Sequence, residues 1–457
     1  MRSFLYPVSS LLTLALLLWS CTPASGPVAH QSIEVEAPFD MPAITVPDFS
    51  NCVRLNIVDF GADPDDPEAT SAALAAAFEE ASAAGGGIVL VPPGTWPSKA
   101  LHFKSHVNLH LEEGAVLEFS GNPEHYLPAV RTSWEGMECY NYSPLIYAYE
   151  CENVAITGAG KLRAKMETWR RWFPRPEAHM EGLKQLYHMA AQGVPLEERQ
   201  MVRDDINMRP HFIQFNRCQN VLMEGVSIEN SPFWVIHPYL CSDVVVRGVH
   251  VYAHGHNNDG VDPEMTQNML VEDCVFDQGD DAIALKSGRN QDAWRLNTPT
   301  RNLVVRNCRV KNGHQLLAIG SELSGGVENV LLDNCVVEEG AQMFHLVFIK
   351  TNERRGGFVR NIYVQNIKAG NISDGVLGIE TDVLYQWRNL VPTYERRLTS
   401  ISDITLKNVE IGDVKFVSQI LADPEAPVKS IVLDQVRYGV LSQEPHIHEH
   451  VEGFEER

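Results

Sequence analysis

A short recurring phrase constrains the fold of this chain more than any other feature. It consists of a polar residue, usually Asn, then alternating aliphatic residues, a small polar turn and further aliphatics. From residue 220 the phrase advances by 23 and then by 25 residues, and later steps are longer because they carry insertions. The copies occupy residues 153–160, 220–228, 243–251, 268–276, 302–310, 329–337, 361–369, 403–411 and 430–438.

Alternating aliphatic residues indicate strands with one buried face, and Gly, Asn and Asp mark the turns between them. A period in the twenties with strands and no intervening helices is typical of a parallel β-helix. Each coil of that fold buries its apolar face only by stacking on the next coil. A leucine-rich horseshoe has a similar period, but its Leu framework and helical side are missing here. The repeat therefore predicts an all-β chain folded as a single parallel β-helix.

The cysteines support the same phasing. Three of them precede the polar residue of the repeat by two positions and three follow it by six: Cys151, Cys218, Cys241, Cys274, Cys308 and Cys335. Two columns of equivalent positions predict stacked, buried thiols that behave as small apolar groups. We expect few or no disulfides, although an exported protein could form them.

The repeat also sets the expected boundaries. Residues 51–442 form the β-helix, and an Ala-rich amphipathic helix at 69–84 covers its first coil. Residues 163–209 are charged and favour helix, so we expect them to leave the coil as an insertion on one face. We expect residues 443–457 to form a solvated tail, in which the HIHEH run could instead bind metal.

The first 21 residues resemble an export signal: an early Arg, then an apolar run too short to span a bilayer. The run ends at Cys21, as in a bacterial lipoprotein signal, although Trp19 is atypical of such a site. We expect Cys21 to be lipidated and residues 22–50 to form a tether, with the protein in the bacterial outer membrane or periplasm. Simple secretion is the alternative, and any contact with a membrane is expected only through this anchor.

The charge of the chain excludes one class of partner. Its 457 residues carry a formal net charge of −22, so no basic surface for nucleic acid is expected. An anionic substrate would have to meet a local basic cleft.

Three aspartates stand out because they crowd two Gly-flanked turns, NNDG at 257–260 and QGDD at 278–281. Aligning residues 274–281 with 308–315 places His314 beside Asp280, because equivalent positions on adjacent coils stack about 4.8 Å apart. Asp259 precedes Asp280 by 21 residues, close to one coil, so these two should also be neighbours. Lys350, in VFIKTN, aligns towards the column of Lys286, in IALKSG.

Crowded carboxylates repel one another, which raises the pKa of one of them and lets it hold a proton. Cleavage of a glycosidic bond needs such an acid together with a carboxylate that activates water or attacks. A nearby Lys or His can anchor sugar hydroxyls or a substrate carboxylate. Each residue alone could simply belong to a turn, but the whole set in one column favours catalysis.

These same motifs, NNDG, GDD, GH at 313–314 and IK at 349–350, resemble the polygalacturonase family, glycoside hydrolase family 28. The resemblance extends from DFGA at 59–62 to IKT at 349–351. It implies a right-handed parallel β-helix of the pectin-lyase-like type that cleaves pectin with inversion. It also implies that neither metal nor cofactor takes part.

The resemblance also implies roles for individual residues. Asp280 corresponds to the general acid, Asp259 and Asp281 to the pair that activates water, and His314 to the histidine beside the acid. Lys350 corresponds to the lysine that holds the uronate carboxylate. Further expected contacts with substrate are Asn257, Lys286, Trp234, His237 and Arg289, although Trp234 could equally pack in a turn.

Three positions depart from the family pattern. Asn258 stands where Thr is usual, Gln315 where Gly is usual, and Phe348 where the family has Arg. The loss of a guanidinium changes how a carboxylate can be held, so a pectic linkage other than homogalacturonan becomes credible. Compensation could come from Arg289, Arg295, Arg354 or Arg355.

The favoured hypothesis is that the chain hydrolyses α-linked galacturonic acid or a related pectic linkage, with a pectic oligo- or polysaccharide as its substrate. Because the 163–209 insertion could narrow the groove, we expect attack at chain ends. Two alternatives are a β-helix pectic lyase and a non-catalytic surface protein that binds glycans.

Overall fold

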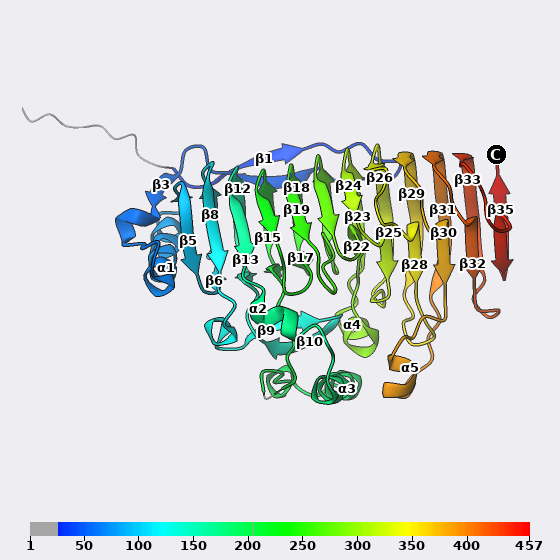
Figure 1. Ribbon diagram of the computed structural model, residues 1–457, viewed down its shortest axis with the longest axis horizontal. Helices are drawn as coiled ribbons and strands as arrows, with labels where there is room; N and C mark the ends of the chain where they lie inside the picture. Colours follow the sequence, from blue (N-terminus) through cyan, green and yellow to red (C-terminus); the bar gives the residue numbers. More distant parts are fainter. Residues whose placement is uncertain (1–25, 204) are drawn as a thin grey trace, which may run out of the picture.

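The computed structural model describes residues 26–203 and 205–457. Its strands stack into a right-handed parallel β-helix with three sheet faces, and its coils follow one another along the long axis (Figure 1). The fold class expected from the repeat is thereby confirmed. The expected signal peptide and the lipidation of Cys21 lie outside the described residues. No helix in the described ranges combines the length and the apolar character needed to cross a membrane.

The first face contains the strands of the repeated phrase, each paired in parallel with the next. It comprises β3 (Val53–Asn56), β4 (Gly87–Val91), β7 (Val107–Leu111), β12 (Glu152–Gly158), β15 (Gln219–Glu224), β18 (Ser242–Arg247), β20 (Gln267–Glu272), β23 (Thr300–Arg306), β26 (Val327–Asp333), β29 (Phe358–Ala369), β31 (Ser400–Ile411), β33 (Val428–Arg437) and β35 (Val451–Glu456).

The second face begins after a turn in each coil, and from β29 onward one long strand serves both faces. Its separate strands are β5 (Gly94–Ser98), β8 (Ala115–Phe119), β13 (Lys161–Ala164), β16 (Ser227–Glu229), β19 (His250–Ala253), β21 (Val275–Gln278), β24 (Arg309–Asn312) and β27 (Val336–Val337).

The third face joins two runs of strands through residues 261–264, which bridge β17 to β22. It comprises β6 (Leu101–His102), β11 (Ile146–Tyr149), β14 (Ile213–Asn216), β17 (Ile236–Tyr239), β22 (Ile283–Leu285), β25 (Gln315–Gly320), β28 (His345–Lys350), β30 (Gly375–Glu380), β32 (Phe416–Leu421) and β34 (His446–Glu449).

The polar residue of the repeat has a backbone reason. In each copy it adopts a positive φ, as at Asn268 (φ 56) and Asn302 (φ 58), and Asn tolerates this left-handed conformation better than most residues. Its side chain also bonds to the equivalent residue of the next coil. The Nδ2 of Asn302 donates to Oδ1 of Asn268 at 3.0 Å, and Nδ2 of Asn329 donates to Oδ1 of Asn302 at 3.0 Å. This ladder fixes the register between coils.

The N-terminal end is covered by α1 (Pro67–Ala83), close to the expected range. Asp66 caps the helix by accepting from the backbone N–H of Glu68, and Pro67 occupies the first helical position. Leu74 and Phe78 are wholly buried against the first coils. The helix thus covers the end of the core that no earlier coil of the described residues covers.

The remaining helices gather on one side of the β-helix, below the third face in Figure 1. They are α2 (Glu167–Arg171), α3 (Glu177–Gln192), α4 (Asn290–Leu296) and α5 (Trp387–Leu390), and an antiparallel hairpin of β9 (Val130–Trp134) and β10 (Met137–Asn141) lies among them. The insertion expected at 163–209 supplies α2 and α3. A satellite core joins the hairpin, α3 and α5 to residues 233–234, and includes Trp134, Leu186, Phe233 and Trp387.

The expected tether at 22–50 is wrong for most of its length. β1 (Ala29–Ile33) and β2 (Ile44–Asp48) form an antiparallel hairpin that lies along the outside of the first face. Ile44 and Val46 are buried against aliphatic residues from successive coils, Val245, Leu270, Val304 and Leu331. The segment therefore straps the coils together.

The expected solvated tail at 443–457 is also wrong. β34 and β35 form a last coil that pairs in parallel with β32 and β33. The HIHEH run lies in β34, where His446 and His448 both lie 2.8 Å from the Ser418 hydroxyl. These two histidines are partly exposed, because no described coil follows theirs.

All eight cysteines of the described residues are buried free thiols, as the two columns predict. The Cys218 thiol interacts with those of Cys151 and Cys241, and the Cys308 thiol with those of Cys274 and Cys335.

Candidate active site

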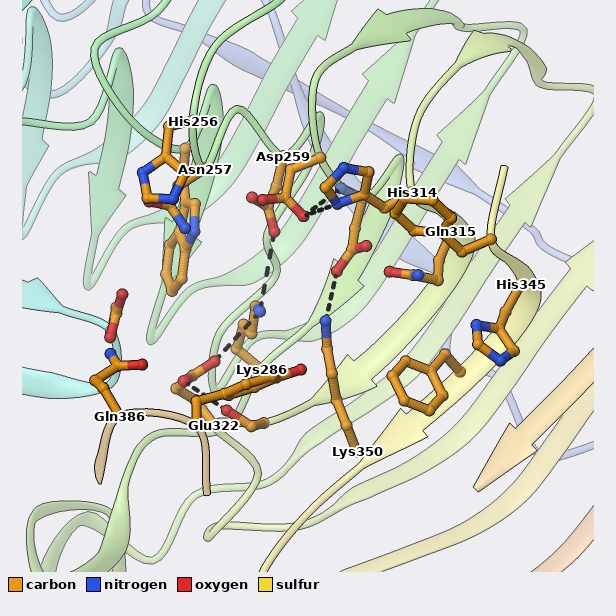
Figure 2. Close-up of a pocket in the computed structure, with 18 of the residues that line it drawn as sticks. His256, Asn257, Asp259, Lys286, His314, Gln315, Glu322, His345, Lys350 and Gln386 are labelled. Atoms are coloured by element: carbon orange, nitrogen blue, oxygen red, sulfur yellow. Dashed lines mark hydrogen bonds and ion pairs between the residues drawn. The ribbon is translucent and has the colours of Figure 1, made fainter. Parts of the chain in front are cut away.

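A cavity of about 450 Å³ opens where the middle of the third face meets the helical side (Figure 2). Side chains from the turns before β22, β25 and β28 line it, together with the β9–β10 hairpin, the insertion and residues 385–387. Nine of the ten predicted site residues line it: Trp234, Asn257, Asp259, Asp280, Asp281, Lys286, Arg289, His314 and Lys350.

The coil register brings the three aspartates together. Gly260 donates its N–H to the carbonyl of Asp281 at 2.9 Å, and Val261 pairs with Ile283. Asp259 therefore lies opposite Asp281. The 21-residue spacing predicts Asp280 as its direct neighbour, which is one residue earlier. Asp259 and Asp281 are almost fully buried, at 3% and 1% exposure, whereas Asp280 is partly exposed. One oxygen of each buried carboxylate, Oδ1, has no hydrogen-bond partner among the described residues.

His314 and Lys350 each contact one of the paired aspartates. The His314 ring nitrogen Nδ1 lies 3.1 Å from Oδ1 of Asp280, and the backbone N–H of His314 donates to the carbonyl of Asp280 at 2.8 Å. The gapless alignment of the two coils predicts this adjacency, which is confirmed. The Lys350 ammonium donates to Oδ2 of Asp281 at 3.1 Å. Lys350 also shares a column with Lys286, because both align with Gly320.

The surroundings push the pKa values of these acids apart. Burial, reinforced by the neighbouring charge of Asp280, raises the pKa of Asp259 well above its ordinary value. Burial also raises the pKa of Asp281, despite the Lys350 ammonium. At Asp280 burial acts upward, but the hydrogen bond from His314 and the charge of Lys350 outweigh it and lower the pKa. The same hydrogen bond raises the pKa of His314.

These directions indicate which groups favour a proton in the free protein. The hydrogen bond between Asp280 and His314 favours an ionised carboxylate and a protonated ring, whereas burial favours the protonated forms of Asp259 and Asp281. A general acid must have a proton to give. A proton on His314 lies within hydrogen-bond distance of Asp280, 3.1 Å from its Oδ1.

Below the aspartates lies a second network of charge. The Lys286 ammonium is 3.9 Å from Asp259, 3.3 Å from Glu322 and 3.0 Å from the carbonyl of Gly320. Glu322 also pairs with Arg289. Burial acts to raise the pKa of Glu322, but the charges of Lys286 and Arg289 outweigh burial and hold this pKa well below the usual range. Lys286 lies 5.0 Å over the Trp234 ring, so Trp234 packs on a cation at the floor of the cavity.

The prediction that His237 contacts substrate is wrong. Its ring is wholly buried and does not line the cavity. It contacts Gln214 at 3.0 Å and Glu264 at 2.9 Å instead. Burial lowers the pKa of His237 to about 3 and raises that of Glu264 to about 8, which favours a neutral pair. Their contact links β17 to residue 264 of the next coil inside the protein.

The departure at Asn258 has a structural explanation. Its Nδ2 donates to the backbone carbonyls of Ser231 and Phe233 at 3.0 and 2.9 Å, beneath the cavity. Asn258 is buried and clamps the preceding coil, so this change from Thr does not alter the cavity wall.

Of the four arginines that could compensate for Phe348, only Arg289 lines the cavity. Arg354 donates to Thr393 and to the carbonyl of Trp387, and Arg355 to Ser321 and Asn290, both in buried structural positions. Arg295 bonds to Asp292 and to the carbonyl of Ala190.

The structure adds lining residues that the sequence reasoning missed. Arg175 comes from the insertion, Glu135 from the β9–β10 hairpin, and Tyr385 from the segment before α5. These three lie outside the repeat, so the coil alignment carries no signal for their position. Phe344 and His345 do follow the repeat, directly after the turn that aligns with Gly313, and could have been found from it.

One group in the cavity has the donor atoms of a cation site. Asp280, Asp281 and His314 each offer a ligand atom, and these atoms lie within 4.8 Å of one another. Both carboxylates already have a partner among the described residues, because His314 contacts Asp280 and the Lys350 ammonium pairs with Asp281.

Comparison with known proteins agrees with this geometry. Residues 188–441 match the family of glycosyl hydrolases family 28. A solved structure of a hyperthermoactive exopolygalacturonase from Thermotoga maritima is similar, with a TM-score of 0.80 and 36% sequence identity. The similarity covers 90% of this chain and 94% of that chain.

Two further relatives are similar in sequence. A probable polygalacturonase of Vitis vinifera is 28% identical over 61% of this chain. An exo-poly-alpha-D-galacturonosidase of Dickeya chrysanthemi is 24% identical over 79% of this chain. The matched regions span only 52% and 62% of those two proteins.

Proposed function

We propose that this chain, which belongs to glycosyl hydrolases family 28, hydrolyses α-linked galacturonic acid or a related pectic linkage with inversion, at the end of a saccharide chain. The observation that carries the proposal is one cavity that contains three aspartates. Asp280 contacts His314, Asp281 contacts Lys350, and Asp259 lies near Lys286. The names of the most similar proteins support the substrate class.

Asp280 is proposed as the general acid. It donates a proton to the glycosidic oxygen as the bond from that oxygen to the anomeric carbon breaks. His314, whose pKa is raised by its hydrogen bond to Asp280, supplies that proton and keeps it available above the ordinary range of a carboxylic acid. Because Asp280 is the most exposed of the three acids, it can reach the leaving oxygen.

Asp259 and Asp281 are proposed to orient and deprotonate the attacking water. Their unpartnered Oδ1 atoms are acceptors that a water can use. The water oxygen bonds to the anomeric carbon from the face opposite the leaving oxygen, and its proton passes to this pair. Lys350 and Lys286 offset the negative charge that the pair carries before it takes this proton.

Attack at a chain end follows from the walls of the cavity. The hairpin residue Glu135, the insertion residue Arg175 and residues 385–387 enclose one side. The satellite core of Trp134, Leu186 and Trp387 holds these walls together. A cavity closed on one side accepts a terminal sugar, whereas the interior of a polymer would need an open groove.

A panel of homogalacturonan oligomers, rhamnogalacturonan backbone and side-chain oligosaccharides tests this proposal. Saturated products followed by chromatography establish hydrolysis, and monosaccharide as the first product establishes action at a chain end. An unsaturated product with ultraviolet absorbance would establish a lyase instead, and no product from any substrate would favour a glycan-binding protein.

We also propose that the protein is exported and lipid-anchored through Cys21, a residue outside the described ranges. The support is the sequence before Cys21, an early Arg and a short apolar run. Labelling with a fatty acid in a bacterial host should mark the wild-type chain and leave Cys21→Ser unmarked. Equal labelling of both would contradict the anchor.

A further inference from the structure

Two arginines in the cavity have donors without partners. Arg289 is buried at 2% exposure, yet its Nε and Nη1 have no hydrogen-bond partner among the described residues. Its Nη2 contacts Glu135 at 3.2 Å and also Glu322, and its guanidinium stacks 4.8 Å over Trp387. An unpaired buried donor is costly and calls for an explanation, such as a ligand that is absent from the structure.

Arg175 approaches the same place from the insertion. Its Nη2 lies 3.6 Å from Glu135 and 3.4 Å from Oδ1 of Asn257, and its Nε is also buried without a partner. We define the helical end of the cavity as Glu135, Arg175, Arg289 and Trp387. Here two guanidiniums flank one carboxylate, and Glu322 is shared with Lys286. Arg175 and Arg289 therefore share Glu135 and still hold buried donor atoms that no described residue accepts from.

The opposite side of the cavity has a different chemistry. We define the aromatic wall as Phe344, His345 and Phe348. His345 stacks on Phe348 with ring centroids 4.5 Å apart and an interplanar angle of 8°, and burial lowers its pKa to about 4, so the ring is neutral. Figure 2 shows His345 and Gln386, the neighbour of Trp387, on opposite sides of the acidic cluster.

The basic side chains beside the aromatic wall already have acidic partners. The Lys350 ammonium pairs with Asp281 while lying 5.7 Å from the Phe348 ring. His314, whose ring centroid lies 4.8 Å from that of Phe344, contacts Asp280. The wall thus offers an apolar surface, which suits the C–H face of a sugar and does not require a free carboxylate.

We propose that Arg289 and Arg175 bind the carboxylate of a terminal uronate at the helical end, and that the aromatic wall accepts the adjoining sugar whether or not its carboxyl group is esterified. This inference rests on the proposed function for the identity of the sugar. Arginine suits the task because its planar fork can hold a carboxylate through two parallel bonds.

Binding of monosaccharides separates this inference from the proposed hydrolysis, because a monosaccharide has no bond to cleave. Dissociation constants of galacturonate and galactose are measured by NMR titration on the full chain. The wild type should bind galacturonate at least ~10-fold more tightly, and Arg175→Gln and Arg289→Gln should each lose about 10- to 100-fold for galacturonate only. Arg295→Gln, in α4 and outside the cavity, is the matched control, and thermal melts check that the variants fold.

Two results would overturn the inference. An equal loss of affinity for galactose in both Arg variants would mean that the arginines shape the cavity and do not bind the carboxylate of the sugar. Loss of the preference for galacturonate in Lys350→Ala, with the preference intact in Arg175→Gln, would place the carboxylate at the aromatic wall instead.

Hydrolysis provides a second, independent readout. The wild type should cleave a digalacturonate that is methyl-esterified only on the sugar adjoining the arginine-bound uronate, within about 3-fold of the rate for the free acid. Phe348→Arg should then favour the free acid by ~10-fold or more, since it adds a guanidinium next to that carboxylate. A wild-type preference as large as that of Phe348→Arg would refute the role of the wall.

Discussion

Replacing Asp280 by Asn separates its chemical role from its structural one. Asn has nearly the same shape, so its side-chain oxygen can still accept from His314 across the 3.1 Å contact. It has no proton to give to the leaving oxygen. Loss of general acid catalysis lowers kcat ~100- to 10,000-fold, equivalent to about 2.7 to 5.4 kcal/mol of transition-state stabilisation.

Folding should survive this change, because one charge leaves a crowded group of acids. Burial and Asp280 together raise the pKa of Asp259, so neutralising residue 280 relieves repulsion and offsets the weaker bond to His314. Asp277→Asn is the matched control. Asp277 also pairs with a histidine, His254 at 2.6 Å, but does not line the cavity.

The assay compares an oligogalacturonide with an aryl galacturonide, whose leaving group needs little protonation. Asp280→Asn should lose most of its rate on the oligosaccharide and much less on the aryl substrate, whereas Asp277→Asn should keep both rates. If Asp280→Asn retained oligosaccharide activity within 10-fold of the wild type, or lost both substrates equally, the general-acid reasoning would be wrong.

Three further predictions concern pH, stability and metal. Because its hydrogen bond to Asp280 raises the pKa of His314, that proton is present below the raised pKa and lost as the pH rises through it. In His314→Gln the alkaline limb of kcat against pH should therefore move to lower pH, and an unmoved limb would contradict this role of His314. Ile44→Ala should lower the free energy of unfolding by about 2–5 kcal/mol in denaturant titrations, because Ile44 is wholly buried under the strap; a loss near zero would mean that the hairpin does not hold the coils. Treatment with a chelator should leave the hydrolysis rate unchanged, since Asp280 already contacts His314 and Asp281 pairs with Lys350; a loss that calcium restores would refute this.

The repeat made most of the β-helix predictable, because register and burial repeat with it. Asn268 and Asn302 recur where the backbone needs a positive φ and where the amide ladder fixes the stacking. The same register put His314 beside Asp280 and Lys350 in the column of Lys286. Residues on neighbouring coils are close for a geometric reason that the sequence spacing contains.

Features outside the repeat could not be placed in this way. Arg175 and Glu135 reach the cavity through segments that pack by their own satellite core, so their spacing carries no register. His237 was misplaced because the helical side covers its strand, and both of the strand's faces become buried. The alternation of Ile44 and Val46 is a signal that could have predicted the buried strand of the strap. The prediction of a solvated tail around His446 and His448 fails because the last described coil has one open side, so its strand is partly exposed.

The most direct test of the central claim is a time course by proton NMR of a short oligogalacturonide during cleavage. An inverting hydrolase that acts on an α-linkage at a chain end should release monosaccharide first, and the new reducing end should appear as the β-anomer before it equilibrates. An α-anomer as the first product would contradict the water-activating role of Asp259 and Asp281. An unsaturated product would contradict hydrolysis altogether.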